Sequence, residues 1–414
     1  MRRLSILLFA LLSCAFLSAQ TALTLAEADQ LLIKNNLDLL AAKYDIDIAE
    51  AQKVQAKLFD NPSVGFNFPV YSKNGGWLDV KGYYDVSLQQ AIQIAGKRKA
   101  GINVAESQKQ LATWQYELLA KQLKYAVHQS YFIIYFTEQS LEKTSVQAAK
   151  IKTVMDALQA QYKRGNVTLD EVLRVTASYN SLSGDILEMT NTIADEKSDL
   201  RTLLLLNSDA EIDVNPTEGE LNKYSLSLLS LQDAIEKAEE QTPEIKTAEA
   251  NIALSEAQLK YEKKQVIPDL QLGVDYDLSG SYEPYLTTAT VGLSIPIFNR
   301  NQGNIKVAEY QLKQAQLAKE TQKNILDNRI VAAYNRAMAI QESSSKIAPD
   351  FESQFDTLIG SVTENYMKRN ISLLEFTDLF ETYHGQIIQL NALKLNRILA
   401  YEDLDYNTGY TLFK

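Results

Sequence analysis

The chain has few of the residues that build disulfide frameworks, metal centres and tight turns. Its 414 residues include one cysteine, Cys14, and two histidines, His128 and His384. A disulfide framework, a zinc-ribbon site and a His-rich metal site are therefore excluded. The 16 glycines and 8 prolines are also fewer than average usage supplies. The sequence thus favours long uninterrupted elements over a small stapled domain.

Positive charge is also in deficit. The 41 Lys and Arg are outnumbered by 52 Asp and Glu, which gives a net charge of −11. A polyanion of this size is a poor binder of a phosphate backbone, so we expect no nucleic-acid partner. Hydrophobic residues make up 46% of the chain, which excludes wholesale disorder. After the first twenty residues, no stretch has the roughly 18 apolar residues that a membrane-spanning helix needs.

No set of residues has the spacing of a catalytic, cofactor or metal site. His128 lies inside a long helical segment, and His384 has an acidic neighbour only at Glu381. Gly75 and Gly76 lie in a predicted loop between strands, not in the strand-to-helix turn of a phosphate site. We therefore expect a protein that is not an enzyme and that carries no cofactor.

The N-terminus has the pattern of an export signal. Arg2 and Arg3 precede an apolar stretch from Leu4 to Leu12, and Leu17-Ser18-Ala19 offers small residues for cleavage. We predict a signal peptide at residues 1–19. The alternative is a lipoprotein cleavage box, which would leave Cys14 as a lipidation site.

The mature chain contains an internal two-fold repeat. Asn166-Val-Thr-Leu-Asp-Glu171 matches Asn370-Ile-Ser-Leu-Leu-Glu375 at an offset of 204, and other matches keep offsets of 203–206. Repetition at a fixed period is a strong indicator of architecture. We predict a first repeat at 20–206, a linker at 207–230 and a second repeat at 231–414.

Each repeat is predicted to run helix, two strands, long helix, turn, long helix. The opening helices begin with Thr24-Leu-Ala-Glu27 and Ser230-Leu-Gln-Asp233, which have capping-box spacing, and are expected to end at Pro62 and Pro268. The later elements are strands 62–70 and 83–94, helix 99–162, turn 163–168 and helix 169–206, followed in the second repeat by strands 268–278 and 287–297, helix 302–366, turn 367–372 and helix 373–406.

The four strands alternate strictly between apolar and polar residues and are joined by loops at 71–82 and 279–286. In the first strand, Val64, Phe66 and Phe68 interleave with polar or small residues. Strands of 9–11 residues with this pattern are typical of outer-membrane barrels. A soluble antiparallel sheet lying on a core gives the same alternation, so the strands alone leave both interpretations open.

The helices favour the interpretation of the strands as part of an outer-membrane barrel. Residues 102–164 contain neither Gly nor Pro, and a helix of that length reaches roughly 90–95 Å. Such a helix needs partners along its whole length. Two apolar rows with coiled-coil spacing, one through Ala112 and Leu119 and one through Leu111 and Leu118, indicate neighbours on both sides, as in a closed ring of helices.

The turns between the long helices are the most specific local motif. Gly165 suits the left-handed position after the first long helix. Arg369 stands where the second repeat would have this glycine, so we expect Asn370 to take the left-handed position there. The exposed tips make two candidate docking sites: Arg164, Gly165, Asn166, Val167, Thr168 and Leu169 in the first repeat, and Arg369, Asn370, Ile371, Ser372 and Leu373 in the second.

This organisation resembles the TolC family of outer-membrane efflux proteins. Ile94-Ala-Gly-Lys-Arg-Lys-Ala100 and Ile295-Pro-Ile-Phe-Asn-Arg-Asn-Gln-Gly303 are similar to its heavy-metal branch, typified by CzcC. The resemblance implies an α+β membrane protein of the cell outer membrane. In the implied homotrimer, four strands per chain complete a trimeric 12-stranded transmembrane β-barrel in outer-membrane lipid, continued by a long periplasmic α-helical barrel of coiled-coil helices.

The resemblance also implies a function and partners. The protein would be the passive outer-membrane channel of a tripartite efflux system, for small solutes or metal cations. A periplasmic membrane-fusion adaptor and an inner-membrane pump, expected to be of the RND type, would deliver the substrate. Glu375 and Asp378 match the acidic residues that line the family's periplasmic gate. Both also have an ordinary structural role, Glu375 in a capping box and Asp378 near the positive end of the helix dipole.

Two other functions remain open from the sequence. One is the outer-membrane duct of a type I protein-secretion system. The other is a periplasmic coiled-coil scaffold that forms no channel.

Overall fold

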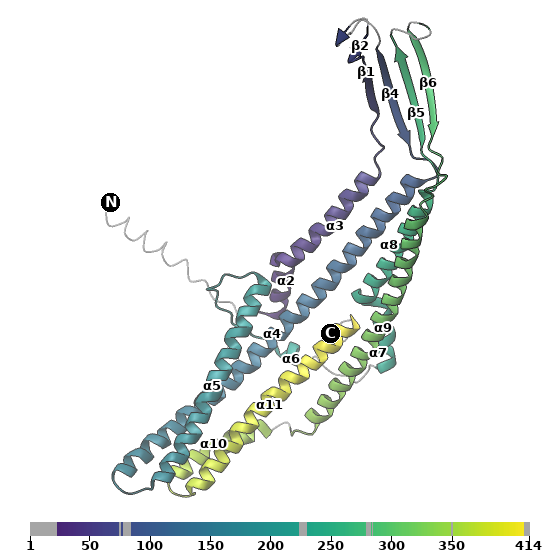
Figure 1. Cartoon of the computed structure of the whole chain (residues 1–414). Coiled ribbons are helices and arrows are strands. Elements are labelled where there is room, and N and C mark those ends of the chain that lie inside the picture. The colour runs from purple at the N-terminus through teal and green to yellow at the C-terminus, as the bar shows by residue number, and fades with distance from the viewer. Residues whose placement is uncertain are drawn as a thin grey trace, which may run out of the picture. The chain divides into compact units, whose positions relative to one another are not determined.

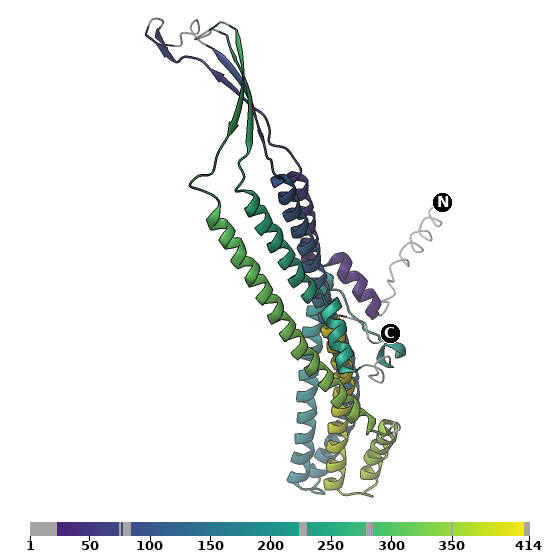
Figure 2. The same cartoon turned by 90° about the vertical axis from the view of Figure 1, so that its right-hand side faces the viewer.

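A computed structural model describes residues 23–73, 76–77, 84–222, 230–278, 283, 285–348 and 351–409 (Figures 1 and 2). The predicted signal peptide at 1–19 and the candidate lipidation site Cys14 lie outside these residues. Within the described ranges, none of the helices combines the length and apolar character that a bilayer span requires.

The chain divides into two units, and each draws on both sequence repeats. The described parts of residues 1–37, 119–240 and 326–414 form the helical unit. The described parts of residues 38–118 and 241–325 form the strand-bearing unit. Because each unit is assembled from both halves of the chain, neither repeat makes a separate domain.

Four antiparallel strands make one sheet in the strand-bearing unit, in the order β1-β4-β5-β6 (Figures 1 and 2). Their bounds are Ser63–Asn67, Asp85–Ile92, Leu270–Asp277 and Leu286–Leu293. The join between the repeats is the β4–β5 pair, whose register places Val86 opposite Tyr276. Outside the sheet, β2 (Tyr71–Ser72) and β3 (Gly76–Trp77) form a short ribbon in a segment expected to be a loop, with the Tyr71 and Trp77 rings 5.6 Å apart.

Within the described part of the chain, the apolar face of this sheet covers no core. The side chains of Val64, Phe66, Val274 and Val291, which the alternation groups together, are all exposed. A soluble sheet lying on a core would bury these residues. The structure therefore gives no support to that interpretation of the alternating pattern.

The prediction of one opening helix per repeat was wrong, because each copy has two. They are α2 (Leu25–Asn35) and α3 (Leu37–Ala56) in the first repeat, and α7 (Leu231–Gln241) and α8 (Pro243–Lys264) in the second. Asn36 is extended between the first two, and its Nδ2 donates to the carbonyl of Leu203 at 2.9 Å.

A proline accounts for the break between α7 and α8. Pro243 is the first residue of α8, where its missing N–H costs nothing, and it prevents α7 from continuing. Both α3 and α8 also end several residues before the prolines at 62 and 268 that were expected to stop them.

The long helices follow the prediction in the first repeat and depart from it in the second. α4 runs unbroken over Lys97–Lys163, and α5 covers Leu169–Leu204. The expected single helix at 302–366 is instead α9 (Gln302–Ser345) and α10 (Phe351–Met367), followed by α11 (Leu373–Thr408). Pro349 stands between α9 and α10 in the sequence, and proline interrupts a helix because it lacks an N–H donor and clashes with the preceding turn. In the part of the expected linker at 207–230 that the structure describes, residues 207–222 and 230, lies one short helix, α6 (Glu218–Asn222).

Candidate functional site

The two turns at the ends of the helical hairpins share one hydrogen-bond pattern. After α4, the N–H of Gly165 donates to Tyr162 O at 2.9 Å and that of Asn166 donates to Gln161 O at 3.0 Å. After α10, the N–H groups of residues 369 and 370 donate to the carbonyls of residues 366 and 365, both at 2.9 Å. Each helix thus ends in a Schellman-type closure that satisfies its last carbonyls.

The left-handed residue occupies the same place in both turns. Gly165 has φ +75°, as predicted, but in the second turn Arg369 has φ +64°. The prediction that Asn370 would take this position was wrong. Asn370 is fixed at the next position, where its Nδ2 donates to Asn365 Oδ1 at 3.2 Å, as Asn166 does to Gln161 Oε1 at 2.7 Å.

A capping box starts each following helix. Thr168 N donates to Glu171 Oε2 at 3.0 Å at the start of α5. At the start of α11, Glu375 N donates to Ser372 Oγ at 3.2 Å, and Ser372 N donates to Glu375 Oε2 at 3.4 Å. The sequence spacing therefore identified both helix starts correctly.

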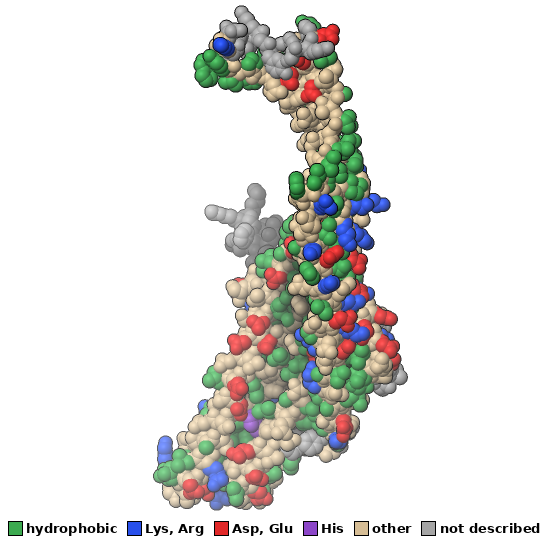
Figure 3. All heavy atoms as spheres, turned by 45° about the vertical axis from the view of Figure 1, so that its right-hand side comes forward, with side chains coloured by type: hydrophobic (Ala, Val, Ile, Leu, Met, Phe, Trp, Pro, Cys, Tyr) green, Lys and Arg blue, Asp and Glu red, His purple; other side chains and the backbone are tan. Residues whose placement is uncertain are grey.

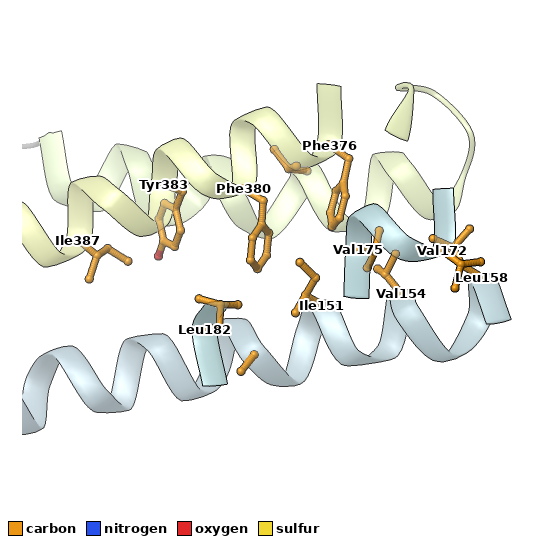
Figure 4. Packing of buried hydrophobic residues seen from close by; sticks show 12 residues of the cluster. Ile151, Val154, Leu158, Val172, Val175, Leu182, Phe376, Phe380, Tyr383 and Ile387 are labelled. Carbon is orange, nitrogen blue, oxygen red and sulfur yellow. The ribbon is translucent and has the colours of Figure 1, made fainter. Parts of the chain in front are cut away.

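A shared apolar core brings the two hairpins together in the helical unit (Figure 4). Ile151 and Val154 of α4 and Phe376, Phe380 and Tyr383 of α11 point toward one another in this view. Residues of all four helices contribute to the cluster: Ala148, Ile151, Val154, Leu158, Val172, Val175, Leu182, Val362, Phe376, Phe380, Tyr383 and Ile387. Both turns are thereby carried by one well-packed base.

The predicted docking residues divide into anchors and exposed groups. Val167, Ile371 and Leu373 are partly buried and pack on the shared core, so they hold the turns in place. The exposed residues are Arg164, Gly165, Asn166, Thr168, Leu169, Arg369, Asn370 and Ser372. Leu374, in the first turn of α11, was not among the predicted docking residues, yet it is 63% exposed. Leu169, in the first turn of α5, is 51% exposed. The sequence contains a signal for Leu374, since it and Leu169 are both large apolar residues at the start of a predicted helix.

Both predicted gate residues are exposed near the start of α11. Glu375 is held by its capping box, as the ordinary structural interpretation requires, while Asp378 lies one turn further along. Beyond them, Glu381 Oε1 accepts from Ser178 Oγ at 3.0 Å, and His384 Nε2 is 2.8 Å from Asp185 Oδ2. These two contacts join α11 to α5 and were not expected from sequence.

His128 is buried between two carboxylates that lie far away in the sequence. Its Nδ1 is 2.7 Å from Glu402 Oε2 and its Nε2 is 3.0 Å from Asp29 Oδ1, so α2, α4 and α11 meet at this ring. Burial opposes the charge on the imidazole, but the hydrogen bonds to Asp29 and Glu402 outweigh it and raise the pKa of His128 to about 9. Asp29 also pairs with Lys124 at 2.8 Å. Among the described residues, no group of three or more His, Cys, Asp and Glu is arranged to hold a metal ion.

Comparison with known proteins identifies the family. The model of the outer membrane efflux protein family matches residues 28–204 and 234–354, well over half of the chain. The chain belongs to the outer membrane efflux protein family. The resemblance seen in the sequence is therefore confirmed.

Individual relatives agree with this assignment. The cobalt-zinc-cadmium resistance protein CzcC of Cupriavidus metallidurans is 24% identical over 323 residues, which cover 78% of this chain and 73% of CzcC. A crystal structure of CusC, a protein that forms a transmembrane channel, aligns with a TM-score of 0.75 at 16% identity. The alignment covers 93% of this chain and 92% of the CusC chain. The open state of the Neisseria gonorrhoeae MtrE outer membrane channel aligns with a TM-score of 0.73 at 15% identity over 94% of this chain and 89% of MtrE.

As a member of this family, the protein is an outer-membrane channel component of efflux systems, with its helical part in the periplasm.

Proposed function

We propose that three copies of this efflux protein form one continuous exit duct through the outer membrane. Four strands from each copy would complete a twelve-stranded barrel, and the helices would continue it as a periplasmic tunnel. The observation that carries the proposal is the open sheet. Its outer strands β1 and β6 each pair on one side, and its apolar side chains are exposed. Open strand edges are not tolerated in lipid, so further copies must cover them.

The hairpin turns are the docking site for a periplasmic adaptor, which connects the duct to an inner-membrane pump of the RND type. Two exposed turns per chain share one rigid core, so a trimer would present six turns on one firm base. Exposed leucines at 169 and 374 and exposed arginines at 164 and 369 supply apolar and cationic contacts. Such a mixture suits a partner helix tip with acidic and apolar residues.

The exported substrates are divalent metal cations or other small solutes. CzcC, named for cobalt, zinc and cadmium resistance, supports the metal assignment. So does the exposed Glu375–Asp378 pair, which three-fold symmetry would turn into six carboxylates around the entrance. A ring of this kind favours cations.

The proposal is tested in a strain that lacks this gene. Restoring the wild-type gene should lower cellular cobalt, zinc or cadmium, measured by mass spectrometry. The double variant Arg164→Glu and Arg369→Glu should fail to do so while its trimer remains intact in detergent, because reversed charge at the turns repels the adaptor. Gly165 is left unchanged, since any side chain there would strain the turn.

The matched control is the double variant Lys150→Glu and Lys152→Glu, which changes the same charge on α4 away from the turns. It should export like the wild type. Full export by the turn variant would refute docking at the turns, and a wild-type protein that stays monomeric in detergent would refute the duct itself.

A further inference from the structure

The helix ends next to the strands carry a charge opposite to that of the whole chain. The segments 53–60, 97–109, 260–269 and 300–313 flank the sheet on α3, α4, α8 and α9, and we call them the basic belt. Together they contain twelve Lys and Arg but five Asp and Glu, a net charge of +7 in a chain of −11. Figure 3 shows basic side chains gathered on the helices next to the strands on the face in view. The positive charge is therefore concentrated in one zone of the strand-bearing unit.

The few carboxylates of the belt are already engaged within the protein. Glu106 pairs with Lys53, Asp269 lies 2.8 Å from Lys97, and Glu309 lies 4.0 Å from Lys263. The remaining two accept hydrogen bonds from amides, Glu262 from Asn301 at 2.6 Å and Asp60 from Gln93 at 3.4 Å. Among the three lysines in these ion pairs, Lys97 is the buried one, with 3% of its surface exposed.

Several cations of the belt have no such partner. Lys99, Lys260, Lys264 and Lys306 are exposed, and among the described residues none of them forms an ion pair. They come from three different helices that meet the sheet, so the surplus belongs to the belt as a whole. An unneutralised, exposed group of lysines attracts an anionic surface within about a Debye length, roughly 8–10 Å at physiological salt.

Large apolar side chains lie in or beside these segments, between the lysines and the strands in the sequence. Phe59 is 72% exposed and Phe298 is 91% exposed, and both belong to the connections between helix and strand. The guanidinium of Arg98 lies 3.9 Å from the centre of the Phe59 ring. Going from helix to strand, the surface thus changes from cations to aromatic rings to aliphatic side chains. This order matches the change from headgroup to acyl chain at a lipid boundary.

We propose that the basic belt binds the anionic phosphate headgroups of the lipid leaflet that faces the helices, with Phe59 and Phe298 inserted at the base of the acyl chains. The inference rests on the proposed membrane insertion of the strands and adds to it a preference for lipid charge. The belt fixes the depth of the channel in the bilayer, because the lysines hold the headgroups while the rings resist withdrawal.

The test compares lipids around the intact full-length channel. The protein is reconstituted in equimolar phosphatidylglycerol and phosphatidylethanolamine, and the lipids retained at its surface are quantified with spin-labelled headgroups. The wild type should prefer phosphatidylglycerol by about five-fold or more at low salt, and added salt should weaken this preference. The quadruple variant Lys99→Gln, Lys260→Gln, Lys264→Gln and Lys306→Gln should lose most of it.

A control variant distinguishes the effect of the belt's lysines from that of the overall charge of the chain. Lys34, Lys43, Lys150 and Lys152 lie outside the belt, and replacing all four by Gln changes the net charge equally. This control should keep the wild-type preference. Equal retention of both lipids by the wild type, or equal loss in both variants, would overturn the proposal. Single-channel conductance is recorded in parallel, so that failure of the channel itself is distinguished from absence of lipid selectivity.

Discussion

At the scale of single residues, the second hairpin turn has a residue with a Cβ in a left-handed conformation, whereas the first has glycine there. Both turns need one left-handed residue, and the chain supplies Gly165 in one and Arg369 in the other. The left-handed region costs a residue with a Cβ about 1–2 kcal/mol, whereas glycine enters it freely. Nothing lies within 4 Å of a Cβ built on Gly165, so the difference between the turns is one of backbone conformation.

We therefore predict opposite effects from one pair of substitutions. Arg369→Gly should stabilise the end of α10 by about 0.5–1 kcal/mol, the relief of strain less the greater freedom of glycine in the unfolded chain. Gly165→Ala should destabilise the end of α4 by about 1 kcal/mol. Amide hydrogen exchange in the two turns measures both. Faster exchange in Arg369→Gly would contradict the assignment of strain.

His128 shows a second effect that belongs to single residues. Its pKa is raised to about 9 because two carboxylates outweigh the burial of the ring. A raised pKa in the folded state means that the charged form stabilises the fold. This stability is fully present below the unfolded value of 6.5 and is lost as pH rises through about 9.

The apparent melting temperature of the wild type in detergent should accordingly fall as pH rises from about 7 to 10. The variant His128→Gln should melt lower at pH 7, by a change equivalent to about 3 kcal/mol, because the buried Glu402 and the partly buried Asp29 lose the cation between them. It should also lose part of the pH dependence. His384→Gln is the matched control, since His384 contacts one carboxylate and is less buried. Equal pH profiles for wild type and His128→Gln would disprove the stabilising role of the His128 contacts with Asp29 and Glu402.

At the scale of elements, one face of α3 has no partner among the residues that the structure describes. Leu40, Tyr44 and Ile48 recur at helical spacing and are all exposed. An exposed apolar row along a helix is typical of a contact with another chain. Within the proposed trimer, we expect a neighbouring copy to cover this row.

Placing charge on this row should weaken the trimer. Tyr44→Asp combined with Ile48→Asp removes apolar contact worth about 2 kcal/mol or more per interface and buries carboxylates without partners. Lys43→Asp on the same helix is the control, since its side chain is exposed and polar already. Light scattering in detergent reports the mass of each variant. A stable trimer in the double variant would place the interface elsewhere.

At the scale of the whole molecule, the proposed three-fold symmetry would multiply the charge of one exposed pair of carboxylates. Glu375 and Asp378 of the three chains would together form a ring of six carboxylates around the proposed entrance. Such a ring concentrates cations because neighbouring charges add in a narrow aqueous pore.

The combined variant Glu375→Gln and Asp378→Asn should lower the cation-to-anion permeability ratio by about two-fold or more in planar bilayers. Gln keeps the capping-box bond that Glu375 makes, so the helix start is preserved and charge alone is tested. Glu171→Gln in the first turn is the matched control and should change selectivity less. Unchanged reversal potentials in the double variant would exclude the gate.

The sequence by itself determined the four strands of the sheet, the long helices α4, α5 and α11, both capping boxes of the turns and the apolar alternation of the strands. These depend on near neighbours in the chain, where spacing and local hydrogen bonds decide the conformation. The same is true of Gly165, whose conformation follows from the absence of a Cβ.

Only the tertiary structure decided the break at Asn36, the pairing of β4 with β5, and the partners of His128. Asn36 is extended because its amide reaches the end of α5, and the carboxylates at His128 come from helices 99 and 274 residues away. Likewise, Arg369 rather than Asn370 is left-handed because the closure of the helix fixes the position and the Asn370 amide is used one residue later. Contacts between distant segments set the first three features, whereas the left-handed Arg369 depends on hydrogen bonds within its own turn.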